Sequence, residues 1–94
     1  MSRKADIAMT FQLGDKVEWG ARTRVHAGTV VGVLPTMTHI MDVDMGDPYM
    51  YMKLPAIGYL WRNHESYIVH VPGRIPRSKG RLYWPRVGGL RKVE

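Results

Sequence analysis

Short stretches of alternating or β-branched residues, separated by glycine and proline, dominate this chain. The stretch KVEW at residues 16–19 alternates polar with apolar positions, and the run TVVGVL at 29–34 ends at a proline. The stretches SYIVHV at 66–71, RLYW at 81–84 and LRKVE at 90–94 add further short segments. Alternation with a period of two and β-branched residues are typical of strands. Because no stretch has a convincing period of 3.6, the pattern predicts an all-β domain of five to seven short strands.

The middle of the chain predicts an inserted β-hairpin, within an insertion at about residues 35–65. In MDVDM at 41–45 the first, third and fifth residues share one face, as do the second, fourth and sixth residues of YMYMKL at 49–54. The GDP sequence between them is typical of a turn. Because methionine is flexible and polarisable, the resulting methionine-lined face either packs on the sheet or forms an interface with a protein partner or with a second copy of the chain in a homo-oligomer. The candidate partner-binding residues are Met41, Met45, Met50, Met52 and Trp61.

Length and composition indicate one globular domain. The chain has 94 residues, of which 45% are hydrophobic, and this balance is too apolar for a disordered protein. Residues 1–10 are expected to be flexible because they are terminal and of mixed composition. No apolar run approaches the roughly 18 residues of a membrane span, and cysteine is absent, which fits a reducing compartment. We therefore expect a cytoplasmic protein without membrane association.

The formal net charge of +6 comes from the last third of the chain. Residues 62–94 contain eight Lys or Arg against two acidic residues, whereas residues 1–61 contain six of each. Such an excess of cations predicts an anionic partner. Two basic loops, at residues 20–24 and 73–81, combine cations for phosphates with nearby aromatic residues on which bases could stack. The candidate nucleic-acid-binding residues are Arg22, Arg24, Arg74, Arg77, Lys79, Arg81 and Trp84.

Several short motifs, taken in order, resemble those of SH3-like barrels of the KOW and Tudor type. GDKV at 14–17 and AGTVVG at 27–32 are similar to the opening strands of such a barrel, and YIV at 67–69, RLYWP at 81–85 and LRKV at 90–93 are similar to the remaining strands. The resemblance implies a small SH3-like barrel of about five strands over residues 11–94, with the hairpin as an insertion.

Within SH3-like folds, the chain also resembles the plasmid-borne type B dihydrofolate reductases, over roughly residues 11–34 and 66–93. This resemblance places Arg81, Leu82 and Tyr83 at the family's pore glutamine, isoleucine and tyrosine. Arginine donates hydrogen bonds but does not accept them, so Arg81 does not reproduce the two-sided pairing of an amide. Residues 35–65 have no counterpart in that family. The resemblance implies a shared barrel, and reductase activity is kept as an alternative.

The remaining motifs do not favour an enzyme. The four histidines do not form the i, i+2 or i, i+4 pairs of a metal site, and no cysteine assists them, so no metal is expected. Nucleophile-elbow and phosphate-loop signatures are absent, so no catalytic residue and no cofactor is predicted.

The predicted function is therefore non-enzymatic binding of DNA or RNA in a bacterial or phage setting, mainly through backbone phosphates. Two alternatives remain. One is a protein–protein interaction module, such as a phage inhibitor of a host nucleic-acid machine, that uses the methionine-lined face. The other is an NADPH-dependent dihydrofolate reductase of the type B kind.

Overall fold

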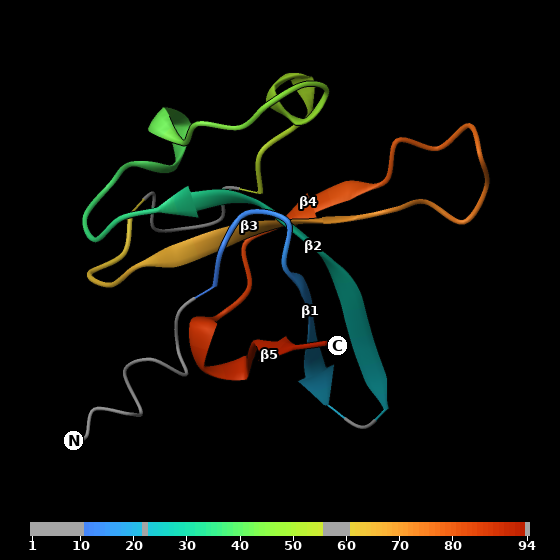
Figure 1. Ribbon diagram of the computed structural model, residues 1–94, viewed down its shortest axis with the longest axis horizontal. Coiled ribbons are helices and arrows are strands. Elements are labelled where there is room, and N and C mark those ends of the chain that lie inside the picture. Colours follow the sequence, from blue (N-terminus) through green and yellow to red (C-terminus); the bar gives the residue numbers. More distant parts are fainter. Residues whose placement is uncertain (1–10, 22, 56–60, 94) are drawn as a thin grey trace.

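The structure, a computed structural model that describes residues 11–21, 23–55 and 61–93, is built on five antiparallel strands (Figure 1). The strands are β1 (Lys16–Ala21), β2 (Arg24–Leu34), β3 (Ser66–Val71), β4 (Arg81–Tyr83) and β5 (Arg91–Lys92). They form one sheet in the order β4-β3-β2-β1-β5, which confirms the predicted all-β class. The predicted barrel is not closed. Its last two strands have three and two residues, and they pair only with β3 and β1.

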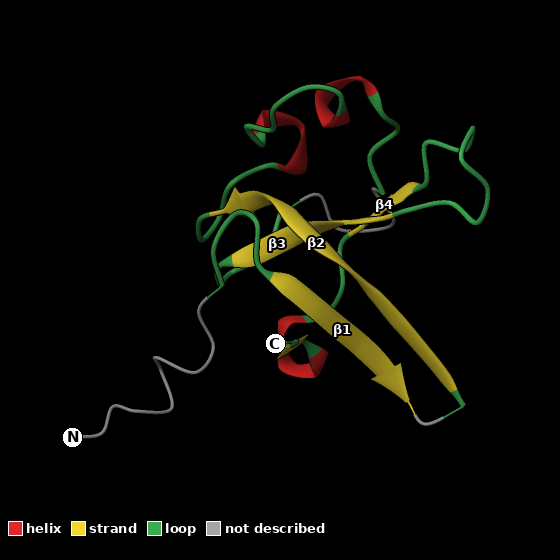
Figure 2. Ribbon diagram, turned by 45° about the vertical axis from the view of Figure 1, so that its right-hand side comes forward, coloured by secondary structure: helices red, strands yellow, loops and turns green. Residues whose placement is uncertain are grey.

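The sheet turns around β2. The first part of this strand pairs with β1 from Arg24 to Thr29, and the second part pairs with β3 from Thr29 to Leu34. The β2–β3 register shifts between Val30 and Gly32, and such a bulge bends a strand and increases its twist. Figure 2 shows β2 running from the hairpin with β1 to the region over β3. One long strand therefore connects two differently oriented halves of the sheet.

Two hydrophobic clusters form the core. One lies among the sheet, the segment before β1 and the turn before β5, and contains Phe11, Val17, Val30, Tyr67, Val69 and Leu90. The other lies where the segment between β2 and β3 packs against the sheet, and contains Val31, Leu34, Ile40, Met45, Ile68 and Leu82. Neighbouring residues of β3 enter opposite clusters, since Tyr67 and Val69 belong to the first and Ile68 to the second. Both faces of β3 are therefore covered.

The predicted hairpin at residues 41–54 is wrong. Two short 3-10 helices occupy this segment, η1 (Ile40–Asp42) and η2 (Tyr49–Tyr51). The backbone N–H groups of Asp42 and Val43 donate to carbonyls three residues earlier, at 2.9 and 3.2 Å, and the η2 segment repeats this arrangement. These local hydrogen bonds use groups that a hairpin would pair across strands. The segment packs on the sheet through side chains such as Ile40 and Met45 instead.

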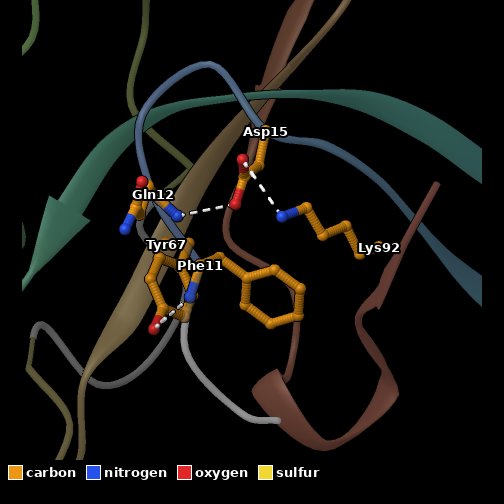
Figure 3. Close-up of polar contacts among 5 residues, drawn as sticks. All are labelled: Phe11, Gln12, Asp15, Tyr67 and Lys92. Atoms are coloured by element: carbon orange, nitrogen blue, oxygen red, sulfur yellow. Dashed lines mark hydrogen bonds and ion pairs between the residues drawn. The ribbon is translucent and has the colours of Figure 1, made fainter. Parts of the chain in front are cut away.

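The described chain begins with a segment that is fastened to β3 and β5 (Figure 3). The backbone N–H of Phe11 donates to the Tyr67 hydroxyl at 3.2 Å, and the two rings meet edge to face. The backbone N–H of Gln12 donates to one carboxylate oxygen of Asp15 at 2.9 Å, and the other oxygen lies 3.7 Å from the Lys92 ammonium. These contacts bring the two ends of the described chain together. The predicted flexible residues 1–10 lie outside the described part.

Candidate functional site

The predicted cations lie on two β-hairpins. The β1–β2 hairpin carries Arg24 at its tip, the connection from β3 to β4 carries Arg74, Arg77 and Lys79, and Arg81 begins β4. The two hairpin ends are separated from each other in both views (Figures 1 and 2). Arg22 lies outside the described residues. The described cations of the prediction are all exposed: Arg24, Arg74, Arg77, Lys79 and Arg81.

The predicted basic loop at residues 20–24 is mostly strand, because β1 continues to Ala21 and β2 begins at Arg24. Ala21 and Arg24 are register partners, so only two residues connect the strands. Gly20 has a φ of 113° and its Cα faces the carbonyl of Arg24 closely enough to leave no room for a Cβ. The two strands therefore extend into the segment where a loop was expected, as far as the paired residues Ala21 and Arg24.

Hydrogen bonds organise the connection between β3 and β4. The backbone N–H of Ser78 donates to the Ile75 carbonyl at 3.0 Å, and the Ser78 hydroxyl accepts from the N–H of Gly80 at 3.1 Å. The Nε2 atom of His70 lies 2.7 Å from the Lys79 carbonyl, so this nitrogen carries the proton and donates it. These contacts fix the end of the basic loop on β3.

The cations of the β3–β4 connection differ from those of β5 in their electrostatic surroundings. Arg91 and Lys92 lie 3.2 and 3.7 Å from the carboxylates of Glu18 and Asp15. No such ion pair forms within the described part of the chain at Arg24 or at the four cations of residues 74–81. Moreover, residues 66–93 contain no acidic residue. Within the described part of the chain, the positive charge of this region is therefore not balanced by a neighbouring carboxylate.

An aromatic cluster joins the inner faces of the two hairpins. Trp19 and His26 are cross-strand partners on β1 and β2, and their rings stack at a centroid distance of 5.3 Å. The ring of Tyr83, on β4, lies 5.5 Å from both. Because a residue from each of three strands contributes, the bend of β2 creates this cluster.

A pocket of about 220 Å³ opens beside the cluster. It is lined by Trp19, Pro55, Arg62, Tyr83, Trp84 and Pro85. Pockets for drug-sized ligands usually measure roughly 300–1,000 Å³, so this one has the size for a single ring system. Its walls are aromatic side chains and prolines, and Arg62 supplies its cation.

Arg62 is fixed against the segment that follows β4. Its two terminal nitrogens donate to the carbonyls of Trp84 and Pro85, each at 2.8 Å, and its Cζ lies 4.0 Å from the centre of the Trp84 ring. Burial lowers the pKa of Arg62, and the nearby positive charge of Arg86 lowers it further. Since arginine starts from a very high pKa, the group stays charged at neutral pH.

Trp84, the predicted aromatic contact, is half-buried and held in place. Its Nε1–H donates to the hydroxyl of Ser66 at 2.9 Å, and the Arg62 guanidinium covers one of its faces. The ring of Tyr83, the preceding residue, is part of the aromatic cluster. Both residues line the pocket described above.

Sequence reasoning did not find Arg62 or His26 as part of the site. The carbonyl partners of Arg62 lie 22 and 23 residues further along the chain, so no local pattern points to them. His26 could have been found, because the pairing of Ala21 with Arg24 places it opposite Trp19. Because a longer loop was predicted at residues 20–24, the pairing of His26 with Trp19 was not expected.

The candidate partner-binding methionines do not share one face. Met45 is buried and Met52 is half-buried, and both pack in the second cluster. Met41 and Met50 are 68% and 54% exposed, and Trp61 is 48% exposed. Because the segment forms 3-10 turns, the alternation expected of strands does not apply. Two of the four candidate methionines, Met41 and Met50, are exposed.

The described residues contain no group of three or more metal-ligating side chains that could hold a metal ion. In the same part of the chain, no helix has the length and apolarity required to cross a membrane. Comparison of the sequence and structure with known protein families, with curated proteins and with solved structures finds no match.

Replacing Arg62 with alanine is expected to lower the free energy of unfolding by about 2 kcal/mol. The change leaves two half-buried carbonyls without their donor and removes the cation from the Trp84 ring. Arg62→Lys keeps the charge but loses the planar guanidinium group. Its free energy of unfolding should therefore lie between those of the parent and of Arg62→Ala. Denaturant unfolding followed by tryptophan fluorescence measures both variants. A loss below about 0.5 kcal/mol for Arg62→Ala would show that water replaces these contacts.

Proposed function

We propose that this protein is a non-enzymatic module that binds DNA or RNA through phosphate contacts at the basic β3–β4 connection. The observation that carries the proposal is the difference between paired and unpaired cations. Arg74, Arg77, Lys79 and Arg81 are exposed without an ion pair in the described structure, whereas Arg91 and Lys92 face carboxylates. A cluster of unpaired cations attracts a polyanion, and counterion release then favours binding.

The proposal includes an SH3-like arrangement, which the strand order supports. A meander from β1 to β4 followed by a return of β5 to the far side of β1 gives the order β4-β3-β2-β1-β5. A 3-10 turn, η3 (Val87–Gly89), connects β4 to β5. A long β2 that pairs with β1 through one half and β3 through the other is also expected of such a fold. These features agree with the resemblance seen in the sequence.

Replacing both Arg77 and Lys79 with alanine is expected to weaken nucleic-acid binding and to reduce its dependence on salt. If both residues contact phosphates, the slope of log K against log salt concentration falls by roughly 1.4 to 1.8. Fluorescence anisotropy of a labelled oligonucleotide, repeated over a range of salt concentrations, measures the slope.

The matched control is the double variant Arg91→Ala, Lys92→Ala, which removes the same formal charge from β5. Its slope should change much less, because Glu18 and Asp15 already neutralise these residues. Equal slopes for the two double variants would show that only the total charge matters. An unchanged slope in the first variant would remove Arg77 and Lys79 from the proposed surface.

A protein partner is a second candidate function, supported by the exposed apolar residues between β2 and β3. Met41, Met50, Tyr51 and Trp61 are each about half exposed or more. An apolar interface resists screening, so a partner bound there should be retained at high salt, unlike a nucleic acid. The reductase alternative has a separate test, which is oxidation of NADPH with dihydrofolate by a tetrameric form of the chain.

A further inference from the structure

We infer that the pocket between the two hairpins holds one unpaired nucleobase, so that the protein prefers single-stranded to double-stranded nucleic acid. This inference rests on the proposed function and adds a ligand class to it. Phosphate contacts alone do not distinguish a single strand from a duplex of similar charge density. A pocket for a base does distinguish them, because the bases of a duplex are stacked and paired inside the helix.

The walls of the pocket suit a flat aromatic ring. Trp19 and Tyr83 come from different hairpins and their rings are inclined by 58°, so they form two sides of an opening rather than a closed stack. Pro55 and Pro85 complete an apolar lining. Every nucleobase has a π-face, and stacking on aromatic side chains is tolerant of sequence. The volume of about 220 Å³ suits one base rather than a larger ligand.

The cation of the pocket distinguishes a base from a positively charged ligand. Arg62 uses two of its five N–H donors on the carbonyls of Trp84 and Pro85, which leaves donors for the carbonyl oxygens and ring nitrogens of a base. Arg86 adds a second positive charge near Arg62. An ammonium group in this pocket would face the like charge of Arg62, to which the nearby charge of Arg86 adds. The aromatic walls therefore favour a neutral base over a quaternary ammonium.

The geometry of β4 connects the pocket to the phosphate-binding surface. Arg81 and Tyr83 are two positions apart on this strand, so their side chains project from the same face at a spacing of roughly 7 Å. Arg81 is exposed and unpaired in the described structure, and Tyr83 lines the pocket. A phosphate on Arg81 and the attached base against Tyr83 can belong to one nucleotide. Base and backbone contacts would then support each other.

The experiment compares three ligands of equal length with the unaltered chain: a single strand, the same strand with abasic sites throughout, and a duplex. Anisotropy at one low salt concentration gives the affinities. The single strand should bind about tenfold more tightly than the abasic strand, since both present the same phosphates and only one presents bases. The single strand should also bind more tightly than the duplex. Quenching of tryptophan fluorescence should accompany binding of the single strand alone.

The variant Tyr83→Ala should remove the difference between the single strand and the abasic strand, whereas Tyr83→Phe should keep it because the ring remains. The ligand comparison uses the unaltered protein, so the inference is tested even if Tyr83→Ala does not fold. Equal affinity for the single strand and the abasic strand overturns the base pocket while leaving phosphate binding in place. Failure of all three ligands to bind at low salt overturns the proposed function and the pocket together.

Discussion

Replacing Tyr67 with alanine is expected to lower the free energy of unfolding by about 3–5 kcal/mol. The side chain is 1% exposed and lies at the centre of the first cluster, in edge-to-face contact with Phe11. Its removal leaves a cavity and deprives the backbone N–H of Phe11 of its acceptor. Because a domain of this size is stabilised by only about 5–15 kcal/mol, the loss is a large share of the total. Guanidinium unfolding followed by tryptophan fluorescence provides the measurement.

The variant Tyr67→Phe separates the ring from the hydroxyl. It keeps the packing and loses the hydroxyl that accepts from Phe11, so a cost of about 1–2 kcal/mol is expected. If the two variants lose the same free energy, the ring does not fill the core as described. If Tyr67→Phe is as stable as the parent, the N–H of Phe11 finds water or another acceptor.

The parent and Tyr67→Phe should also differ in how their free energy of unfolding depends on pH. Burial raises the pKa of Tyr67, and this effect exceeds that of the hydrogen bond from Phe11, which lowers it. A pKa that is higher in the folded than in the unfolded state stabilises the fold fully below the unfolded value of about 10, and the contribution is lost as the pH rises through the folded value. The parent should therefore lose stability faster than Tyr67→Phe above about pH 10. Parallel curves would contradict the burial of this hydroxyl.

Replacing Gly28 with alanine is expected to cost about 3 kcal/mol of unfolding free energy, the second largest effect. A Cβ at this position on β2 would overlap the backbone carbonyl of His70 and crowd the Val69 side chain. The His70 carbonyl belongs to the sheet, so it moves only if the β2–β3 pairing shifts. An added Cβ at Gly28 therefore disturbs β2, the strand at which the sheet bends. The melting temperature and denaturant unfolding of the variant measure the loss.

Gly32→Ala is the matched control, since it adds the same methyl group to the same strand. Its nearest neighbours would be side-chain atoms of Val43 and Met45 at 2.9 and 3.0 Å, which can move aside. We expect a cost of about 1 kcal/mol or less. Equal losses for the two variants would show that backbone crowding at Gly28 is not the cause.

The strands of the sheet could be predicted where their own residues specify them. The predicted segment at 66–71 matches β3, and its mixture of β-branched and aromatic residues suits a strand that is covered on both faces. The predicted beginning of β1 at Lys16 is also confirmed. The loop predicted at residues 20–24 was wrong, because β1 and β2 continue to the paired residues Ala21 and Arg24, and the polar and small residues there are compatible with either a loop or strand ends.

The conformation of the insertion and the pocket could not be predicted from local pattern. The alternation of methionine with polar residues at 41–54 fits a strand. The segment forms 3-10 turns instead, with hydrogen bonds between residues three apart and with Ile40 and Met45 buried. The position of Arg62 depends on two carbonyls from a segment more than 20 residues away. Neither the burial of these residues nor the contacts of Arg62 produce a periodic pattern in the sequence.

The sequence by itself determined the all-β class, the identity of the main strands and the concentration of positive charge in the last third. Alternation, β-branching and charge are local properties, so they can be observed without a fold. Only the tertiary structure decided which cations stay unpaired and which aromatic side chains meet. Trp19 and His26 meet through the β1–β2 pairing, and Tyr83 on β4 joins them because β2 bends at its bulge and turns one hairpin toward the other.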